Sequence, residues 1–384
     1  MQGRVLNNRI PVLHVINGRF FGGGHRSTLL LMNELDRDKG VITELCTLGD
    51  GGELPLHGRK SVVVPFDGRY NNPWVLLETA RHLAAVLDVR RPEILHTHGL
   101  DADLIGAIAA LGRPVRHVSH LRISPPSGRH ESWQARIRRV LFCFLTARKG
   151  TVFIAVSEAV RLEMAKYYCL PLQQIVTVLN GIDCNEFGDK AVNSQSINAG
   201  SRRFVIGSAG RLVPMKGFEH LIAAAKTLAD SGLLFEVRIA GTGSQRAALE
   251  QVARDLGISG LVQFLGPVQD MASFYRSLDV FVLPSVSTEG LPLVVLEAMA
   301  SRVPVVATRL AGAPEVIESG VNGLLVPPGD VGVLAEALMG LAGDAKLRLK
   351  FAELGVAHVR EKFTVERVAE QVAAVYRILI RSNS

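Results

Sequence analysis

The chain has 384 residues, 48% hydrophobic and 21% charged, which is typical of a folded globular protein and excludes a disordered one. This length exceeds what one hydrophobic core usually supports and therefore predicts two domains. The formal net charge of +7 lies mostly in residues 1–190, which carry 24 Lys and Arg against 18 Asp and Glu; residues 191–384 carry 19 against 18. The first half should attract an anionic partner: a phospholipid surface, a pyrophosphate-linked acceptor or nucleic acid.

The first apolar run, at residues 10–16, is short and ends in Asn17, Gly18 and Arg19. Such a run is typical of a first β-strand, because a signal peptide needs a longer apolar stretch and a small-residue cleavage site. The sequence has no uncharged apolar run of 18 residues, so we expect no transmembrane helix and a cytoplasmic location. The four cysteines are scattered without a C-x-x-C pair, and we expect neither disulfides nor a metal site.

Short β-rich runs alternate with longer helical patterns, which predicts an α/β protein of two doubly wound, Rossmann-like domains. The expected strands are residues 12–16, 61–65, 94–96, 115–119 and 153–156 in the first half, and 204–209, 235–240, 262–264, 280–283, 305–307 and 323–326 in the second. The expected divisions are a domain at 1–187, a polar linker at 188–203, a domain at 204–365, and a C-terminal helix at 366–384 that packs back towards the first domain. Ligands of such sheets bind beyond the carboxyl ends of the strands.

Three features of the first half lie at such strand ends. Gly23 and Gly24 belong to a triple glycine between the first strand and an apolar-periodic helix, and glycine suits close approach of a ligand. His98 follows one strand, and His120 ends another. A lone histidine is more often structural than catalytic, so the strand-end position is what makes these two candidates.

The segment 129–149 holds six basic residues and one acidic residue, interleaved with Trp133 and other large apolar side chains. A basic amphipathic helix of this kind can rest on an anionic membrane. The competing interpretation is a core helix with ordinary arginines on its outer face. Both interpretations remain open from the sequence.

In the second half, Arg211 and Lys216 lie on a glycine-bounded loop directly after the strand 204–209. Two cations on such a loop suit a pyrophosphate, whose charge must be neutralised as it leaves. After the next strand, Gly241 and Gly243 would let a ligand approach the backbone. Arg246 occupies the position where a dinucleotide fingerprint requires a third glycine, which disfavours a Rossmann dehydrogenase.

The most specific segment runs from the strand 280–283 through Glu289, Gly290, Leu291 and Pro292 to Glu297. Pro292 suits the first turn of a helix, so Glu289 is expected at the helix start and Glu297 within it. Backbone N–H groups at Gly290 and Leu291 would face a docked phosphate. Glu297 stands among apolar residues, where a carboxylate needs a partner; two sugar hydroxyls would satisfy it, whereas a Glu facing water is the simpler alternative.

The pattern S-x(3)-E-G-x-P-x(4)-E-A resembles the signature of retaining family 4 glycosyltransferases of GT-B fold, and the resemblance extends through residues 303–308, 312–317 and 322–326. It implies that Arg211 and Lys216 bind the donor diphosphate, Glu297 the ribose, and Glu289 the transferred sugar. It also implies that Gly290 to Pro292 donate from the backbone, and that the backbone near Val268 contacts the base. Arg302 departs from the family, which usually has glycine at this helix end.

In the first half, the resemblance implies that the loop with Gly23 and Gly24 closes over the sugar and phosphate. His120 would lie beside the donor sugar, while His98 and Asn180 would line the acceptor side. The implied reaction retains the anomeric configuration through front-face departure and attack, without a divalent metal or other cofactor.

We expect a UDP-sugar donor and a glycan or lipid-linked acceptor of cell-envelope polysaccharide or lipopolysaccharide synthesis. The location would be the cytoplasm or the cytoplasmic face of the inner membrane. A GT-B nucleotide-sugar epimerase is the alternative, followed by a non-enzymatic two-lobed binding protein. Nucleic-acid binding is not expected, because no aromatic–basic motif supports it.

Overall fold

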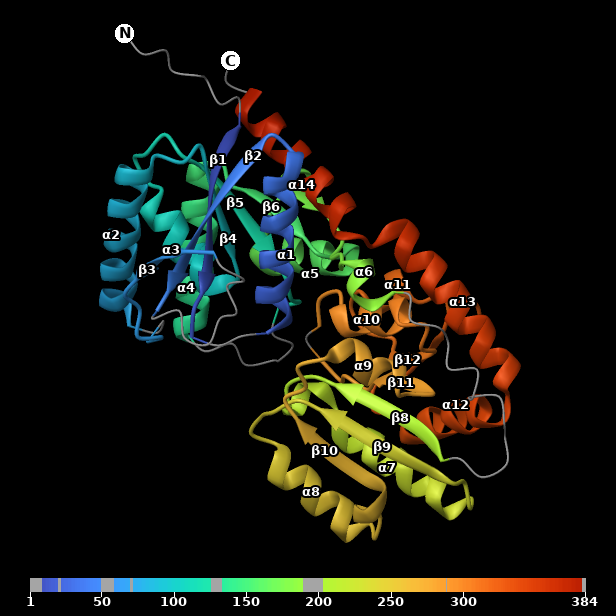
Figure 1. The fold of residues 1–384 in the computed structure, drawn as a ribbon. Helices are drawn as coiled ribbons and strands as arrows, with labels where there is room; N and C mark the ends of the chain where they lie inside the picture. The colour runs from blue at the N-terminus through green and yellow to red at the C-terminus, as the bar shows by residue number, and fades with distance from the viewer. Residues whose placement is uncertain are drawn as a thin grey trace. The chain divides into compact units, whose positions relative to one another are not determined.

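The computed structural model describes residues 9–19, 22–49, 59–69, 72–125, 133–188, 203–287 and 289–381 (Figure 1). The chain forms two compact units: unit 1 is Met1–Gly181 with Val365–Ser384, and unit 2 is Ile182–Thr364. The sequence placed the expected end of the first domain at residue 187, whereas this division falls after Gly181. Ile182 belongs to unit 2 because its amide donates to the carbonyl of Phe363 at 2.9 Å. Most of the expected linker, 189–202, lies outside the described residues.

Unit 1 contains a parallel sheet of seven described strands in the order β3-β2-β1-β4-β5-β6-β7. The strands are β1 (Ile10–Asn17), β2 (Val41–Leu48), β3 (Ser61–Val64), β4 (Ile94–His98), β5 (Arg116–Leu121), β6 (Val152–Ala155) and β7 (Ile175–Thr177). β2 and β7 were not predicted from the sequence. Val12, Ile94, Val118 and Ile154, from the neighbouring strands β1, β4, β5 and β6, are buried in one hydrophobic core.

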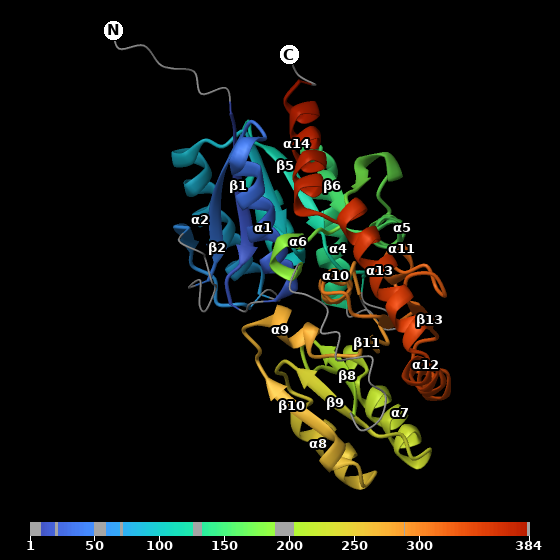
Figure 2. The same ribbon diagram turned by 45° about the vertical axis from the view of Figure 1, so that its right-hand side comes forward.

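Helices cover both faces of this sheet (Figures 1 and 2). They are α1 (Gly23–Asp38), α2 (Pro73–Arg90), α3 (Leu100–Ala109), α4 (Trp133–Lys149), α5 (Glu158–Tyr168) and α14 (Val365–Arg381), with a short 3-10 turn at Leu172–Gln174. The apolar sides of α1 and α14 share one core with the first face of the sheet. On the other face α3 packs so closely that a Cβ at Gly106 would lie 2.5 Å from Thr97 Cγ2.

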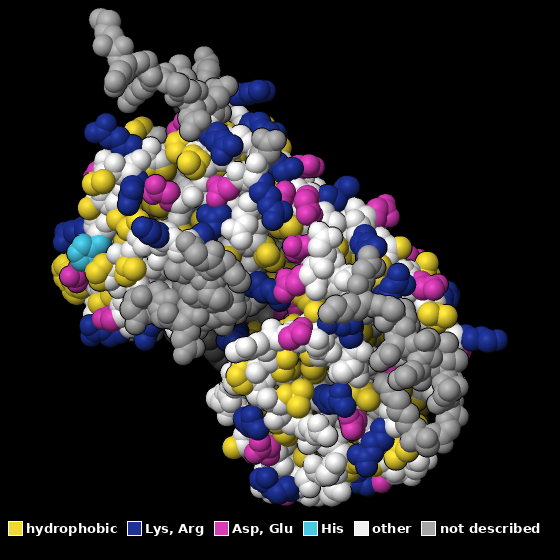
Figure 3. Space-filling view, in the orientation of Figure 1, with side chains coloured by type: hydrophobic (Ala, Val, Ile, Leu, Met, Phe, Trp, Pro, Cys, Tyr) yellow, Lys and Arg dark blue, Asp and Glu magenta, His cyan; other side chains and the backbone are white. Residues whose placement is uncertain are grey.

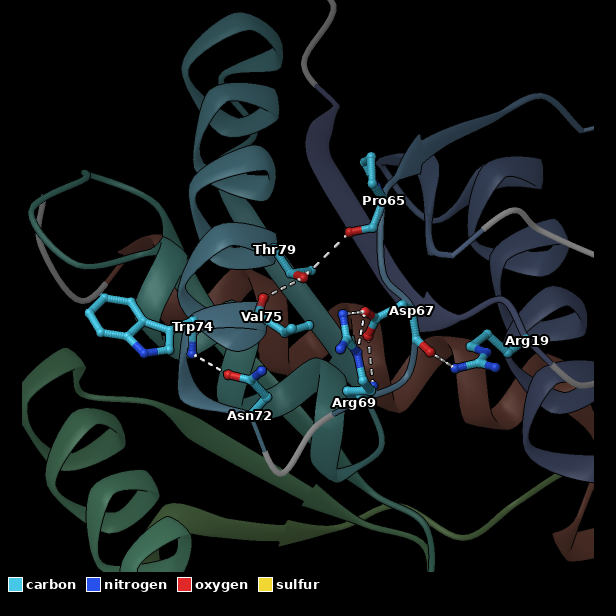
Figure 4. A network of polar contacts seen from close by, with 8 residues as sticks. All are labelled: Arg19, Pro65, Asp67, Arg69, Asn72, Trp74, Val75 and Thr79. Atoms are coloured by element: carbon cyan, nitrogen blue, oxygen red, sulfur yellow. Dashed lines mark hydrogen bonds and ion pairs between the residues drawn. The ribbon is translucent and has the colours of Figure 1, made fainter.

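Polar contacts tie the loop after β3 to the start of α2 (Figure 4). The Asn72 side chain caps the helix by accepting from the Trp74 amide at 3.0 Å, and Pro73 occupies the first turn. The Thr79 hydroxyl lies 2.8 Å from the carbonyl oxygen of Val75 and 3.4 Å from that of Pro65, at the end of β3. Arg19 in turn donates to the backbone carbonyl of Asp67, which links the loop after β1 to the loop after β3.

Unit 2 contains a parallel sheet of six described strands in the order β10-β9-β8-β11-β12-β13. The strands are β8 (Phe204–Ala209), β9 (Phe235–Ala240), β10 (Val262–Gly266), β11 (Val280–Leu283), β12 (Val305–Thr308) and β13 (Leu324–Val326). Its helices are α6 (Cys184–Phe187), α7 (Phe218–Asp230), α8 (Arg246–Asp255), α9 (Met271–Arg276), α10 (Leu293–Ala300), α11 (Ala313–Val316), α12 (Val331–Gly343) and α13 (Ala345–Lys362), with 3-10 turns at Pro214–Lys216 and Ser259–Leu261. The six expected strands of this half all exist, with ends shifted by up to two residues.

The turn after α10 explains why Arg302 is unusual. Its φ of 60° places a non-glycine residue in the left-handed region. The Arg302 amide donates to the carbonyl of Met299 at 3.0 Å, and the Val303 amide donates to that of Ala298 at 3.0 Å. These bonds close the end of the helix in the way that glycine usually does without strain. The side chain is exposed and forms no part of the core.

We predict that Arg302→Gly raises the free energy of unfolding of unit 2 by about 0.5–1 kcal/mol. The left-handed strain of a non-glycine residue disappears, and part of that gain offsets the greater chain entropy of glycine in the unfolded state. Urea denaturation checks this, with Arg302→Ala as the matched control, because alanine removes the charge and keeps the strain. Equal stability of the glycine and alanine variants would contradict the explanation.

Candidate functional site

In unit 2 the candidate site lies where the strand order reverses. β8 has β9 on one side and β11 on the other, so the β8–β11 boundary is the topological switch point of the sheet. Loops that follow such strands diverge to opposite faces and leave a crevice at the carboxyl edge. The loop after β8 carries Arg211 and Lys216, and the loop after β11 carries Glu289. The switch point thus brings together the two motifs that the sequence separates by over 70 residues.

An ion pair joins these two loops. Lys216 Nζ lies 2.5 Å from Glu289 Oε1, and both side chains are largely buried. The hydroxyl of Ser285 donates to the same carboxylate oxygen at 2.5 Å. Ser285 is itself held by Thr308, whose hydroxyl donates to the Ser285 carbonyl at 2.6 Å. The carboxylate of Glu289 is therefore oriented by a cation and a hydroxyl before any ligand is bound.

Backbone contacts between the same loops explain Gly217. Its φ is 62°, and a Cβ there would lie 2.2 Å from the carbonyl oxygen of Pro284. The Val286 amide donates to the carbonyl of Met215 at 2.9 Å, which adds a second backbone link. Only glycine fits where the loop after β8 passes this close to the loop after β11. Lys216 is thus held next to Glu289 by the packing of Gly217 as well as by the ion pair.

Glu297 lies within α10 and is 4% exposed, so its side chain does not face bulk water. The hydroxyl of Tyr275 on α9 donates to Glu297 Oε2 at 2.8 Å. A partner for this carboxylate was expected from the sequence, with sugar hydroxyls as candidates, but Tyr275 was not foreseen. A contact with the ribose stays a prediction.

The structure gives Gly241 and Gly243 a role within the fold. A Cβ at Gly241 would lie 2.0 Å from the Gly210 carbonyl oxygen, and one at Gly243 would lie 2.3 Å from that of Leu212. The Leu212 amide also donates to the Thr242 carbonyl at 2.8 Å. The close backbone approach that these glycines permit is therefore made by the loop after β8. Their contact with a donor stays a prediction.

The remaining predicted donor residues surround these loops. Arg211 is exposed, so its guanidinium is accessible to solvent. Gly290, Leu291 and Pro292 are buried at the start of α10, where Pro292 is the N-cap residue rather than a first-turn residue. Val268 lies between β10 and α9, next to the Gly266 carbonyl that accepts from the Gly241 amide at 2.7 Å.

In unit 1 four buried histidines gather at the switch point between β1 and β4. The parallel register pairs His14 with His96 across β1 and β4, and His98 with His120 across β4 and β5. Residues in register, and residues two apart on one strand, share a face of a sheet. The four rings accordingly lie on one face, with the centroids of His96 and His98 4.2 Å apart and those of His98 and His120 5.3 Å apart.

Arg122 determines which nitrogen of two of these rings carries a proton. A guanidinium only donates, so His98 Nδ1, 3.0 Å from Arg122 Nη2, must accept. His98 in its neutral form then carries its proton on Nε2 and donates to His14 Nδ1 at 2.9 Å. His14 therefore carries its own proton on Nε2. His96 is held separately, by a 2.5 Å contact between its Nδ1 and the Tyr376 hydroxyl of α14.

Burial keeps these histidines neutral. Removal from water lowers the pKa of His14 to about 3 and holds those of His96, His98 and His120 well below 6.5. The cation of Arg122 acts in the same direction on all four. The pKa of Arg122 itself is lowered to about 10 by burial, so it stays charged at neutral pH.

His14, His96 and His98 form the one histidine or acid cluster, among the residues that the structure describes, with ligand atoms spaced for a metal ion. Their hydrogen bonds do not suit a cation. His98 Nε2 carries a proton in the arrangement set by Arg122, so it has no lone pair to offer. A second positive charge would also lie beside a buried guanidinium. The donor set favours an anionic or neutral ligand instead.

The opposite face of the same strands carries a second buried network. Thr97 donates to Asp103 Oδ1 at 2.5 Å and lies 2.9 Å from His117 Nε2. His117 Nδ1 lies 2.9 Å from the Thr151 hydroxyl. Burial raises the pKa of Asp103 to about 7 and lowers that of His117 to about 3. This network lies under α3 and was not found from the sequence.

The predicted residues of unit 1 lie around the histidine cluster. A Cβ at Gly24 would be 3.4 Å from Cδ of Arg122, and Asn180 Oδ1 accepts from Ser27 in α1 at 3.4 Å. His98, His120 and Asn180 were predicted from the sequence as site residues, whereas His14, His96 and Arg122 were not. The alternation of His96 and His98 along one strand was a usable signal, because it places two imidazoles on the same face.

Two family models match the chain: Glycosyltransferase Family 4 over residues 21–186 and Glycosyl transferases group 1 over residues 203–344. The D-inositol 3-phosphate glycosyltransferase of Corynebacterium urealyticum is 38% identical over 184 residues, which are 46% of this chain and 43% of that protein. The match thus spans less than half the length of that relative. The capsular polysaccharide biosynthesis glycosyltransferase CapM of Staphylococcus aureus is 28% identical over 306 residues, covering 76% of this chain and 78% of CapM.

Among solved structures, Anabaena HepE in complex with UDP-glucose matches with a TM-score of 0.82 and 24% identity, over 96% of this chain and 100% of that chain. Two parallel-sheet α/β units of this kind define the GT-B fold, so the expected fold class is confirmed. The chain belongs to the family 4 glycosyltransferases, as the motif around Glu289 and Glu297 indicated.

The buried histidines lead to a prediction about pH. His14, His96, His98, His117 and His120 have native pKa values below 6.5, so the unfolded chain binds more protons once the pH falls below that value. Stability is then lost by about 1.4 kcal/mol per pH unit for each histidine. Asp103 has the opposite sign, since its raised pKa favours the native state as the pH falls below 7, and it offsets one histidine.

We therefore predict that unit 1 loses several kcal/mol of stability between pH 7 and pH 5. Urea-dependent hydrogen exchange, followed at peptide level over β4 and β5, measures this directly. The strands β8 and β9 of unit 2 are the internal reference for the same samples. A stability of unit 1 that is flat or rising over this range would contradict burial of neutral imidazoles.

Proposed function

We propose that this chain transfers a sugar from a nucleoside diphosphate sugar, with UDP-sugars favoured, to a glycan or lipid-linked acceptor. The observation that carries the proposal is the joining of the two switch-point loops of unit 2 by Lys216 and Glu289. It places an accessible guanidinium, an ammonium and a pre-oriented carboxylate at one sheet edge. The guanidinium of Arg211 and the ammonium of Lys216 can bind a diphosphate, and a sugar hydroxyl can donate to the carboxylate of Glu289.

Catalysis on this proposal is mainly stabilisation of the departing diphosphate. Arg211 and Lys216 neutralise the charge that grows on the phosphate oxygens as the bond to the sugar breaks. Lys216 would then share its hydrogen bonds between the phosphate and Glu289, while Ser285 continues to hold the carboxylate. Fixed cations fill the role of a divalent metal. The anomeric configuration would be retained, as the resemblance to family 4 implies.

The relatives and structural neighbours support the class of substrate. CapM acts in capsular polysaccharide biosynthesis, and solved neighbours include HepE with UDP and with UDP-glucose. A relative in Rhizobium meliloti, LpsE, acts in lipopolysaccharide core biosynthesis. We infer an acceptor of envelope polysaccharide or lipopolysaccharide synthesis on this basis.

We also propose that unit 1 rests on an anionic membrane through α4. Five large apolar side chains of this helix are between 40% and 71% exposed: Trp133, Ile137, Val140, Leu141 and Phe144. Their spacing puts them on one helical face. The described basic side chains of the helix are Arg136, Arg138, Arg139 and Lys149, and its sequence has no acidic residue. Such a stripe inserts at the headgroup boundary while its cations meet anionic lipids.

Two structural observations bear on the choice between a core helix and a membrane helix. The opposite face of α4 is in the core, through Phe142 and Leu145, so the sequence correctly indicated a packed side. No helix among the described residues is long and apolar enough to span a bilayer.

On the face seen in Figure 3, basic side chains are scattered over both units and mixed with acidic ones. Attraction to a membrane is therefore argued from α4 rather than from a single charged patch.

We predict that Lys216→Ala lowers kcat for nucleotide release by about 10²–10³, the usual effect of losing one donor that stabilises developing charge. The assay measures UDP release from a panel of UDP-sugars with lipid-linked and glycan acceptors in the presence of EDTA. Lys226→Ala is the matched control, since Lys226 pairs with Asp230 on the exposed side of α7. A Lys216 variant within a few-fold of wild type would refute the leaving-group role. Formation of a new nucleotide sugar without UDP release would indicate an epimerase.

We predict that replacing Trp133 and Phe144 together by Ser weakens binding to vesicles with anionic lipid by about tenfold or more, because two aromatic anchors are lost. Sedimentation with phosphatidylcholine vesicles, with and without phosphatidylglycerol, measures the bound fraction. Trp74→Ser is the control, because Trp74 is equally exposed on α2 (Figure 4). Equal loss in both variants, or no binding of wild type to either vesicle, would rule out docking through α4.

A further inference from the structure

The helix α4 contacts the end of α5 at a place remote from the candidate site. α5 connects the neighbouring parallel strands β6 and β7, so it runs against the strand direction and ends near the amino edge of the sheet. Ligands of such sheets bind at the opposite, carboxyl edge. Chemistry at the end of α5 is therefore separate from the sugar transfer proposed above.

Two side chains of α4 donate to the last carbonyl groups of α5. The final carbonyls of a helix have no partner within the helix itself. Arg139 Nη1 donates to the Tyr167 carbonyl oxygen at 3.0 Å, and the Cys143 thiol donates to that of Tyr168 at 3.0 Å. Residues four apart share one face of a helix, so a single face of α4 closes the end of α5.

A second cysteine lies directly beside this contact. Cys169 follows Tyr168 as the C-cap residue of α5, with a left-handed φ of 52°. Its side chain is exposed, and its sulfur lies 3.9 Å from the Lys166 carbonyl oxygen. A carbonyl oxygen lies about 2.8 Å from the next Cα atom along the chain, so Cys143 Sγ is within about 6 Å of the Cα of Cys169. The two thiols are therefore neighbours in space, although 26 positions separate them in the sequence.

The two thiols differ in their access to solvent. Cys169 is exposed and can be reached by a molecule in solution, whereas Cys143 is half-buried. Burial raises the pKa of the Cys143 thiol, while the nearby cation of Arg139 acts in the opposite direction and favours the thiolate. Cys46 is fully buried, which raises the pKa of its thiol to about 12 and makes it an unreactive reference within the same chain.

We propose that Cys143 and Cys169 form a reversible thiol-oxidation site that closes to a disulfide between α4 and the end of α5. The Cys169 thiolate attacks one sulfur of a small disulfide such as glutathione disulfide, which forms a mixed disulfide and releases one glutathione thiolate. The Cys169 side chain rotates about its Cα–Cβ bond, and the Cys143 thiolate attacks the Cys169 sulfur and releases the second glutathione thiolate. The protons of the two cysteine thiols pass to the two glutathione thiolates, so the protein loses two electrons and glutathione disulfide gains them. The new bond ties the helix with the exposed apolar stripe covalently to α5.

The test maps the thiols of the full chain after incubation with glutathione disulfide under native conditions, acid quenching and alkylation. Digestion with trypsin and a protease that cleaves before aspartate separates Cys169 from Cys184, because Asp183 lies between them. We expect mass spectrometry to find a peptide pair that links Cys143 to Cys169 and disappears on reduction, while Cys46 stays unmodified. Glutathione that remains on Cys169 without this link, a dimer joined through Cys169, or two thiols that both stay reduced would overturn the proposal.

A variant of Cys143 separates closeness of the two thiols from mere exposure of Cys169. Cys143→Ser keeps a donor for the Tyr168 carbonyl but cannot resolve the mixed disulfide, so glutathione on Cys169 should rise about tenfold or more over wild type. Cys184→Ser is the matched control and should leave the link at its wild-type level. An equal amount of glutathione on Cys169 in wild type and Cys143→Ser would contradict resolution by Cys143. The mapping needs neither donor nor acceptor, so its result does not depend on the proposed function.

Discussion

The ion pair between Lys216 and Glu289 is the contact on which the account of unit 2 depends. It joins loops from the two strands at the switch point, and a hydroxyl from Ser285 converges on the same carboxylate. The pair is largely buried, so either charge alone would be costly there. A ligand phosphate bound to Lys216 would draw part of its hydrogen bonding away from the Glu289 carboxylate. A sugar hydroxyl could then donate to Glu289 in its place.

The switch point of unit 1 differs from that of unit 2 because it is not built around an ion pair. It gathers neutral imidazoles and one guanidinium, and the hydrogen bonds of His98 and His14 follow from the fact that arginine only donates. The two units thus present different chemistry at equivalent edges of similar sheets. One holds an ion pair, and the other holds a guanidinium that is hydrogen-bonded to neutral groups.

Much of the fold could be predicted from the sequence because strand runs and helical patterns alternate clearly, above all in unit 2. β2 was missed although its residues alternate in burial at first, and β7 was missed because three residues give too little pattern. The division between the units at Ile182 could not be predicted, since it depends on pairing of Ile182 with Thr364, 182 positions further on. Local composition instead drew attention to the polar segment 188–203.

In the candidate site, too, residues within a local motif could be predicted, whereas their contacts with residues distant in the sequence could not. Lys216, Glu289 and Glu297 were identified from a motif, but their partners Ser285 and Tyr275 were not, because a hydroxyl has no distinguishing local pattern. Gly241 and Gly243 were predicted to contact the donor, which stays a prediction, but their close contact with the backbone of the loop after β8 was not foreseen. Arg122 became notable only when the structure showed that its partners are neutral. Contacts across a sheet depend on register, and one sequence does not reveal register.

The central claim is that the joined loops of unit 2 hold a nucleoside diphosphate. A crystal structure of the chain grown with UDP tests this most directly. The account predicts the β-phosphate within hydrogen-bonding distance of both Arg211 and Lys216, with Glu289 still bound to Ser285. UDP bound elsewhere, or those loops without UDP at saturating concentration, would contradict it.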